Sequence, residues 1–177
     1  DVSAGLGLHE YPLDRNCRNP RPIHDFAYRW YTGDLHSEPT REGGRAPVII
    51  EAAAGEATIQ AVGDVLREIV HVEKVPKEQV AVLLGGSLRT SAIWHHGRFK
   101  GGIDLWNANA ATRTGETLRL AFDAVPAQPR GTILCDSIRR FKGLDREVVI
   151  LAELDPDDDR LGPLLYVGAS RAREHLV

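Results

Sequence analysis

The chain has 177 residues, of which 42% are hydrophobic and 27% charged, a composition that suits one domain with a buried core. A net charge of −3 and a pI of about 6.2 argue against nucleic-acid binding by the whole surface, so any DNA contact needs a local basic stripe. Cys17 and Cys135 lack C-x-x-C spacing, and no signal peptide or long apolar stretch occurs. We therefore expect a reduced, cytoplasmic protein without membrane contact. The start at Asp1-Val2 and the lack of methionine indicate an excised fragment.

Five short apolar runs are predicted to be strands that are buried on both faces of a sheet. Near-continuous Val, Ile and Leu, without polar alternation, is typical of a parallel sheet covered by helices. In chain order these runs are 48–52, 80–84, 132–135, 148–151 and 176–177. Residues 118–122 alternate less clearly and are a further candidate strand.

Apolar residues at helical spacing fall between these runs and predict three helices. Their stripes run over 23–30, 59–70 and 161–172. Pro76 ends the second helix, and Ser170, Arg171 and Arg173 fall off the apolar stripe of the third. Residues 32–46 read as a loop. Alternating strands and helices predict an α/β layer structure with right-handed crossovers.

Residues 137–145 (S-I-R-R-F-K-G-L-D) directly follow a predicted strand. In an open parallel sheet, ligands bind beyond the carboxyl ends of the strands, which makes this segment a candidate site. Arg139, Arg140 and Lys142 provide the charge density that contact with phosphate requires. Gly143 permits an unusual backbone angle or a close approach. From charge alone, a solvated basic loop remains the alternative.

Two further segments carry arginines in recognisable patterns. Residues 165–173 read L-Y-V-G-A-S-R-A-R, and residues 13–19 read L-D-R-N-C-R-N, with Ile23 following. In chain order, residues 13–19, 137–145 and 165–173 resemble the fourth, fifth and sixth motifs of UvrD/Rep-like superfamily 1 DNA helicases. Taken singly, the segment at 13–19 is a weak signal that fits a loop before a capped helix. The segment at 165–173 also fits the end of a helix with cations near its C-terminus.

The resemblance implies a fold and a domain. It predicts a RecA-like three-layer sandwich, with a mainly parallel sheet and helices on both faces. Residues 1–177 would form one domain, the second RecA-like domain of the family, and the spacing between the motifs leaves no room for a large inserted subdomain. The fold would bring Arg18 and Arg171, from opposite ends of the chain, to one edge of the sheet.

The resemblance also implies the nucleotide-binding residues. Arg171 corresponds to the arginine finger, whose guanidinium stabilises charge that develops on the γ-phosphate, and Arg18 to a second cation on that phosphate. Asp145 stands where the family's acidic residue meets the ribose, beside Gly143. Cys17 replaces a tyrosine that packs on adenine, and a thiol offers no comparable π face.

Contact with the DNA backbone is implied for Ser137 and Arg139, with Lys142 as a further cation. Arg139 departs from the usual histidine of the family, and Asp145 from the usual glutamate. An arginine still serves a phosphate, whereas the shorter aspartate has less reach toward a ribose.

Other features favour structural roles. His95 and His96 lack partners at metal-ligand spacing, so no metal site is predicted. The aspartates at 155–159 lack the glycine and the glutamate of a calcium loop and read as a solvated connection. Trp94, Phe99 and Trp106 could form a stacking platform for single-stranded DNA, but core packing is favoured.

The function that follows is the C-terminal motor domain of an ATP-dependent DNA helicase or translocase, of the kind that acts in DNA repair. No G-x-x-x-x-G-K-[S/T] loop occurs in the sequence. ATP with Mg²⁺ is therefore expected to be held mainly by an N-terminal RecA-like domain that is absent here, and single-stranded DNA is the expected partner. The chain alone is predicted to be inactive. The alternative is a non-motor module that binds nucleic acid or protein through a helicase-derived fold.

Overall fold

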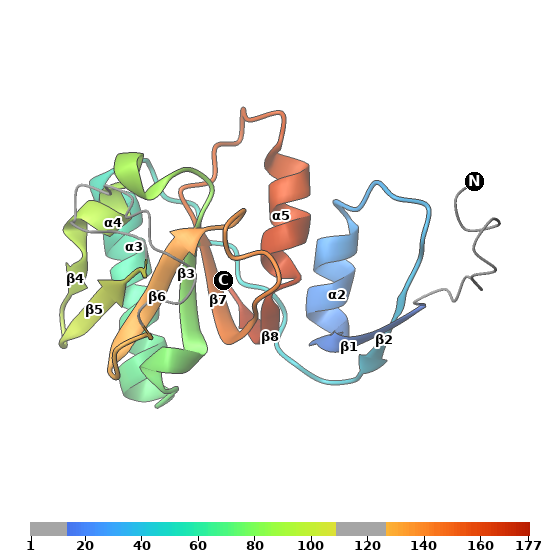
Figure 1. Ribbon diagram of the computed structural model, residues 1–177, viewed down its shortest axis with the longest axis horizontal. Helices are drawn as coiled ribbons and strands as arrows, with labels where there is room; N and C mark the ends of the chain where they lie inside the picture. The colour runs from blue at the N-terminus through green and yellow to red at the C-terminus, as the bar shows by residue number, and fades with distance from the viewer. Residues whose placement is uncertain (1–13, 109–126) are drawn as a thin grey trace.

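A six-stranded sheet forms the centre of the structure, a computed structural model that describes residues 14–108 and 127–177 (Figure 1). Neighbouring strands in this sheet are parallel except for the antiparallel pair at one edge, β4 and β5. In spatial order the strands are β4 (Arg98–Phe99), β5 (Ile103–Trp106), β6 (Thr132–Ser137), β3 (Val80–Leu84), β7 (Arg146–Ala152) and β8 (Ala172–Leu176).

The central strand β3 shows why both faces of the sheet are covered. All five of its side chains are fully buried. Val80, Val82 and Leu84 belong to one hydrophobic cluster, whereas Ala81 and Leu83 belong to another on the opposite face. This alternation follows from the strand period of two residues. The V-A-V-L-L run was therefore correctly predicted as a strand buried on both faces.

Helices supply the two outer layers. The first cluster includes residues of α3 (Glu56–Arg67) and α4 (Ala92–His96), and the second includes residues of α2 (Arg21–Tyr28) and α5 (Leu161–Ala169). A π-helical turn, Glu68–Val72, prolongs α3, and 3₁₀ turns occupy Lys77–Gln79 and Leu88–Thr90. The predicted α/β fold, with a mainly parallel sheet and helices on both faces, is confirmed.

A small two-stranded sheet stands beside the main one. It pairs β1 (Arg15–Pro20) with β2 (Glu38–Arg41) in parallel, and α2 connects the two strands (Figure 1). Neither strand was predicted, because β1 is polar and β2 lies in the Gly-, Glu- and Arg-rich stretch that was read as a loop. Leu13 and the candidate strand at 118–122 lie outside the described residues.

The predicted strand at 48–52 is wrong. Val48, Ile49 and Ile50 are 45%, 74% and 48% exposed, and the segment has no regular secondary structure. It runs beside the edge strand β8, where the Val48 N–H donates to the Leu176 carbonyl (3.0 Å). This contact does not continue into a ladder. Apolar character alone does not distinguish a paired strand from a segment that follows a sheet edge.

The last predicted helix extends too far. It ends at Ala169, and Arg173 lies in β8 rather than on the helix. The Arg171 N–H donates to the Gly168 carbonyl (3.1 Å), a tightened last turn that leads the chain directly into β8. The predicted strand at 176–177 is therefore the end of a strand that starts at Ala172.

The connection from β6 to β7 has no helix. Residues 138–145 cross from the carboxyl end of β6 to the amino end of β7, passing over β3 on the face that α2 and α5 cover. Ile138 and Phe141 are buried at 0% and 1% exposure and anchor this crossover to the sheet. The segment predicted to carry chemistry therefore runs from the carboxyl ends of the strands to their amino ends.

The aromatic residues of the proposed stacking platform are mostly internal. Trp94 and Phe99 are buried in the first hydrophobic cluster, and Trp106 packs against the second. Core packing, the favoured interpretation, is confirmed. Among the residues described, no helix is both long enough and apolar enough to cross a bilayer.

A buried histidine predicts a pH dependence of stability. Burial, and then the Arg45 cation, lower the pKa of His175 below its usual value of 6.5, and the Arg45 Nη1 lies 3.3 Å from His175 Nδ1. The unfolded chain then takes up the proton first, so this contribution to stability is complete above pH 6.5 and is lost as the pH falls below it. The free energy of unfolding, measured against pH, should decline less steeply below pH 6.5 in His175→Gln. Equal slopes for both proteins would contradict this origin.

Candidate functional site

Three segments that are distant in sequence bring Arg18, Asp145 and Arg171 together. Arg18 Nε lies 3.6 Å from one carboxylate oxygen of Asp145, and Arg173 Nη1 lies 4.0 Å from the other. Burial, followed by the nearby Arg18 cation, lowers the pKa of Arg171 from its usual value. Arg18 and Asp145 are about two-fifths exposed, so solvent weakens their attraction. The predicted meeting of Arg18 and Arg171 occurs, with Asp145 beside both.

This cluster lies at the amino ends of β7 and β8. Asp145 immediately precedes β7, Arg171 immediately precedes β8, and the Arg146 N–H donates to the Arg171 carbonyl (3.1 Å). A site for the whole 137–145 segment at the carboxyl ends of the strands was expected, and that placement holds only for its beginning. The crossover carries the end of the segment, Asp145, to the amino ends of the strands.

Arg171 is held by backbone carbonyls. Its Nε donates to the Val167 carbonyl (3.1 Å) and its Nη1 approaches the Leu144 carbonyl (3.5 Å). Carbonyls in the last turn of a helix carry partial negative charge, which favours a cation there. The guanidinium stays protonated despite its lowered pKa. Arg171 is therefore a charged, half-buried group with a defined orientation.

The other predicted nucleotide-side residues surround this cluster. Cys17 is exposed on β1, next to Arg18, and its thiol is free. Gly143 has φ of +94°, in the region that favours glycine, and a Cβ at this position would meet no neighbouring atom. The glycine is required by the backbone angle and not by close packing. Its turn directs the chain toward Asp145.

Polar groups also gather at the carboxyl ends of β3 and β6, where Ser137 lies. A cavity of ≈ 430 Å³ is lined there by the loop after β3, including Ser87 and Thr90, and by Asp136, Ser137 and Arg140. The Arg140 N–H donates to Ser137 Oγ (3.4 Å), and Arg140 Nε lies 3.6 Å from Asp136 Oδ1. Hydroxyls beside an arginine are a typical lining for a phosphate. The loop after β3 was not predicted to contribute to a site, because its sequence, Gly-Gly-Ser-Leu-Arg-Thr, has no distinctive spacing of polar residues.

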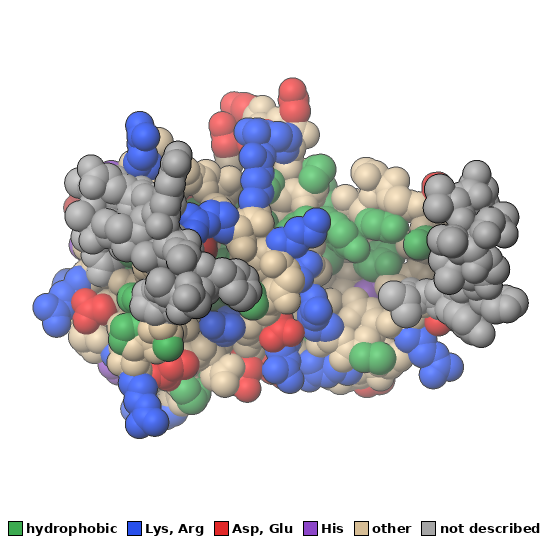
Figure 2. Space-filling view, in the orientation of Figure 1, with side chains coloured by type: hydrophobic (Ala, Val, Ile, Leu, Met, Phe, Trp, Pro, Cys, Tyr) green, Lys and Arg blue, Asp and Glu red, His purple; other side chains and the backbone are tan. Residues whose placement is uncertain are grey.

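Arg139 and Lys142 are exposed on the crossover. Figure 2 shows basic side chains over the middle of the visible face and acidic ones on the loop above α5. In that loop, the hydrogen bonds from Arg160 lower the pKa of Asp158 to about 2, and the charge of Arg139 contributes less. The near-neutral chain thus carries a local concentration of cations.

Two residues whose roles were missed tie β1 to β8. Asn19 is buried, and its Nδ2 donates to the carbonyls of Ser170 (3.1 Å) and Ala172 (2.7 Å). Arg41 Nη1 donates to the carbonyls of Arg18 (2.7 Å) and Arg173 (2.8 Å). Asn19 falls within the segment at 13–19, but no pattern in the sequence indicates a bond across the length of the chain.

An aromatic cluster joins the helices that flank the arginines. The Tyr31 ring lies 5.1 Å from that of Tyr28 and 4.9 Å from that of Tyr166, measured between centroids. Burial, followed by the charges of the other two tyrosines, raises the pKa of Tyr166. Aromatic contacts of this kind hold α2 against α5 and so fix the helix end that carries Arg171.

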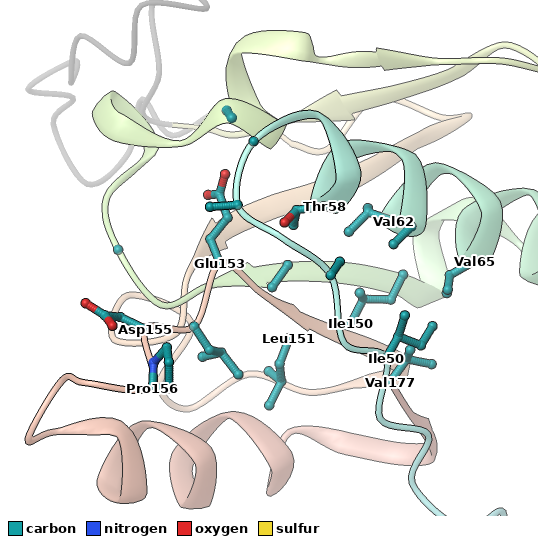
Figure 3. Close-up of a pocket in the computed structure, with 18 of the residues that line it drawn as sticks. Ile50, Thr58, Val62, Val65, Ile150, Leu151, Glu153, Asp155, Pro156 and Val177 are labelled. Carbon is teal, nitrogen blue, oxygen red and sulfur yellow. The ribbon is translucent and has the colours of Figure 1, made fainter.

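A larger cavity, lined mostly by apolar side chains, lies next to the polar cavity and shares Thr90 with it. It has a volume of ≈ 750 Å³ and lies between α3 and the carboxyl end of β7. Ile50, Val65 and Val177 close one end, and Glu153 stands at the other (Figure 3). Glu153 Oε1 accepts a hydrogen bond from the Ile93 N–H (3.1 Å) at the start of α4. With few polar groups converging on it, the cavity suggests no chemistry. Within 14–108 and 127–177, no three His, Cys, Asp or Glu side chains are grouped to hold a metal ion.

Comparison with known proteins gives two matches. Residues 132–177 match the family model described as the UvrD-like helicase C-terminal domain. The structure is similar to the crystal structure of the C-terminal domain of a possible DNA helicase from Lactobacillus plantarum WCFS1, with a TM-score of 0.57 and 22% identity over 91% of this chain and 84% of that one. No curated protein matches. The family match confirms the resemblance carried by residues 137–145 and 165–173, and the structural match confirms the fold.

Proposed function

We propose, from the similarity of residues 132–177 to the C-terminal domain of UvrD-like helicases, that the chain is the second motor domain of an ATP-dependent DNA helicase or translocase. One observation carries the proposal. Arg18 and Arg171, from opposite ends of the chain, meet beside Asp145 at one edge of the sheet. Two guanidinium groups at one place form a site for a polyphosphate.

The arginines would act on the transferred phosphoryl group. Negative charge spreads over its oxygens in the transition state, and an oriented guanidinium stabilises that charge. Arg171 suits the role of arginine finger because backbone carbonyls orient it, and the more exposed Arg18 suits that of a second phosphate contact. In the chain alone, Asp145 partly neutralises Arg18, so binding of a polyphosphate would replace one anion by another.

The substrate, ATP with Mg²⁺, would be held mainly by another domain. Phosphate-loop motors hold Mg²⁺ and the β- and γ-phosphates with a glycine-rich loop and its lysine, and this sequence has no such motif. The cations here fit the outer side of the phosphates, with Asp145 and the Gly143 turn toward the ribose and Cys17 toward the base. Closure of the two domains around ATP would complete the site.

Single-stranded DNA would bind near the carboxyl ends of the strands, away from the arginines. Ser137 lies in the polar cavity at the carboxyl ends of the strands, and Arg139 and Lys142 are exposed on the crossover that leads from it. The same crossover ends at Asp145, beside the arginines. A displacement of the crossover on ATP binding would therefore reach the DNA-binding residues, which is the coupling that a translocase requires.

The proposal predicts a division of labour that ATP turnover can test. The 177-residue chain alone should release no phosphate from ATP above background. A fusion to an N-terminal RecA-like domain that carries the phosphate loop should hydrolyse ATP, and single-stranded DNA should stimulate it. The control is the same fusion with the lysine of that loop replaced by alanine.

Two outcomes would overturn the proposal. Turnover by the isolated chain would contradict the division of labour. A fusion that binds ATP and single-stranded DNA without turnover would favour a non-motor module that binds nucleic acid through a helicase-derived fold.

A further inference from the structure

The buried side chain of Asn19 holds the backbone on both sides of Arg171. Asn19 is 2% exposed, and both carbonyls that accept from its Nδ2, those of Ser170 and Ala172, flank Arg171 directly. The carbonyl of Arg171 itself accepts from the N–H of Arg146. Three successive carbonyls at this turn are therefore occupied, and the peptide groups that orient Arg171 have little freedom.

The same side chain is tied to the part of β1 that presents Arg18. Asn16 Nδ2 donates to Asn19 Oδ1 (3.0 Å), and Asn16 Oδ1 accepts from the backbone N–H groups of Arg18 (3.0 Å) and Asn19 (3.1 Å). A continuous path of hydrogen bonds thus runs from the backbone of Arg18 through two amides to the backbone of Arg171. The side-chain N and O atoms of Asn19 all have partners along it.

We propose that Asn19 is a positioning residue that sets the spacing between Arg18 and Arg171, so that both guanidinium groups meet one polyphosphate. The inference rests on the proposed function. Asn19 touches no substrate atom in this role and acts only through the two arginines. Contacts between guanidinium and phosphate depend on geometry, so a small change in spacing weakens both at once.

Electrostatics explain why such a tie is needed. Arg18 and Arg171 are like charges, and Asp145 is a carboxylate that interacts with both of them. Repulsion favours a wider spacing unless the backbone resists it. Arg41 adds a second tie, since it bonds the carbonyls of Arg18 and Arg173 and forms an ion pair with Glu174. Asn19 is the better target because it is buried and uncharged.

A matched control separates positioning from general stability. Asn107 is also buried (4% exposed), and its Nδ2 donates to the Cys135 carbonyl (2.7 Å). Cys135 lies in β6, which does not pair with β7 or β8. Leucine has the same branched arrangement of side-chain heavy atoms as asparagine and carries no donor. Asn19→Leu and Asn107→Leu should both lower the free energy of unfolding, because each removes hydrogen bonding from a buried amide to backbone carbonyls. Only Asn19→Leu should alter the arginines.

The experiment is a titration of the 177-residue chain with inorganic pyrophosphate, followed by NMR of the arginine Nε–H signals. In the wild type, the signals of Arg18 and Arg171 should move with one shared dissociation constant. Asn107→Leu should reproduce that constant. Asn19→Leu should raise it by about tenfold, the cost of a misplaced contact, and the two signals should no longer move together. Asn19→Ser, which keeps one hydroxyl donor, should fall between the wild type and Asn19→Leu.

The outcomes are distinguishable. A wild-type chain whose Arg18 and Arg171 signals do not respond to pyrophosphate overturns the proposed polyphosphate site and the role of Asn19 with it. A normal wild-type response with an unchanged constant in Asn19→Leu overturns only the positioning role. If Asn19→Leu does not fold, the same criterion applies to Asn19→Ser.

Discussion

Replacing Arg171 by alanine in a fusion that hydrolyses ATP should lower the turnover rate by about 10³-fold to 10⁵-fold, the range that arginine fingers contribute. The reason is that the charge of the transition state would lose its oriented guanidinium. The KM for ATP should change far less than kcat, since a finger acts mainly on the transition state. The measurement is steady-state phosphate release in the presence of single-stranded DNA.

The control for this variant is Arg67→Ala. Arg67 lies on α3, on the other face of the sheet, and its ion pair within the described residues is with Asp64, one turn away (3.0 Å). Its loss should leave turnover within about twofold, because an exposed pair of this kind contributes little. Removing the Arg171 side chain also deletes its bonds to Val167 and Leu144, so the folded state of each variant must be checked by its melting temperature. A fusion with Arg171→Ala that is folded and fully active would contradict the proposed role of Arg171 as an arginine finger.

Replacing Phe141 by alanine should destabilise the chain by about 3–5 kcal/mol, the usual cost of truncating a buried phenylalanine. Phe141 is 1% exposed in the cluster with residues of α2 and α5, and the Arg146 guanidinium lies 5.7 Å from its ring centroid. It is the largest side chain that anchors the crossover of residues 138–145. The free energy of unfolding, from urea denaturation with an unchanged m-value, measures the effect.

The matched control is Leu144→Ala in the same crossover. Leu144 is 52% exposed, so its truncation should change stability by no more than about 0.5 kcal/mol. Similar losses for Phe141→Ala and Leu144→Ala would show that the crossover is not anchored by its buried ring. Because the crossover joins Ser137 to Asp145, Phe141→Ala at a temperature where the fusion stays folded should also reduce the stimulation of ATP turnover by DNA.

Several parts of the fold were predictable because local patterns decide them. The V-A-V-L-L run of β3 is apolar on both faces because helices cover both faces, and the run itself reports this. The stripes of α2 and α3 likewise report the faces that these helices bury. Elements that depend on distant partners were not predictable. The polar strand β1 exists because it pairs with β2 and is tied to β8, and nothing in its own sequence requires an extended conformation.

The errors have the same origin. The apolar run at 48–52 has the composition of a strand, but its N–H and C=O groups find no continuous ladder beside β8. The apolar stripe of α5 continues to Ala172, yet the helix ends at Ala169 because the chain must enter β8 and pair with β7. In both places the tertiary context overrides a local pattern: the first segment lacks a continuous pairing partner, and the second pairs with β7.

By itself, the sequence determined which residues are candidates for the chemistry, namely two arginines and an aspartate in recognisable segments and a basic segment with a glycine. It also predicted that strands such as β3 are buried on both faces. Only the tertiary structure decided that Arg18, Asp145 and Arg171 meet at the amino ends of β7 and β8 while Ser137 lies at the opposite side of the sheet. The physical reason is that such proximity depends on strand order and on the path of the crossover. Both follow from long-range pairing and burial, and neither is encoded by the spacing of residues along the chain.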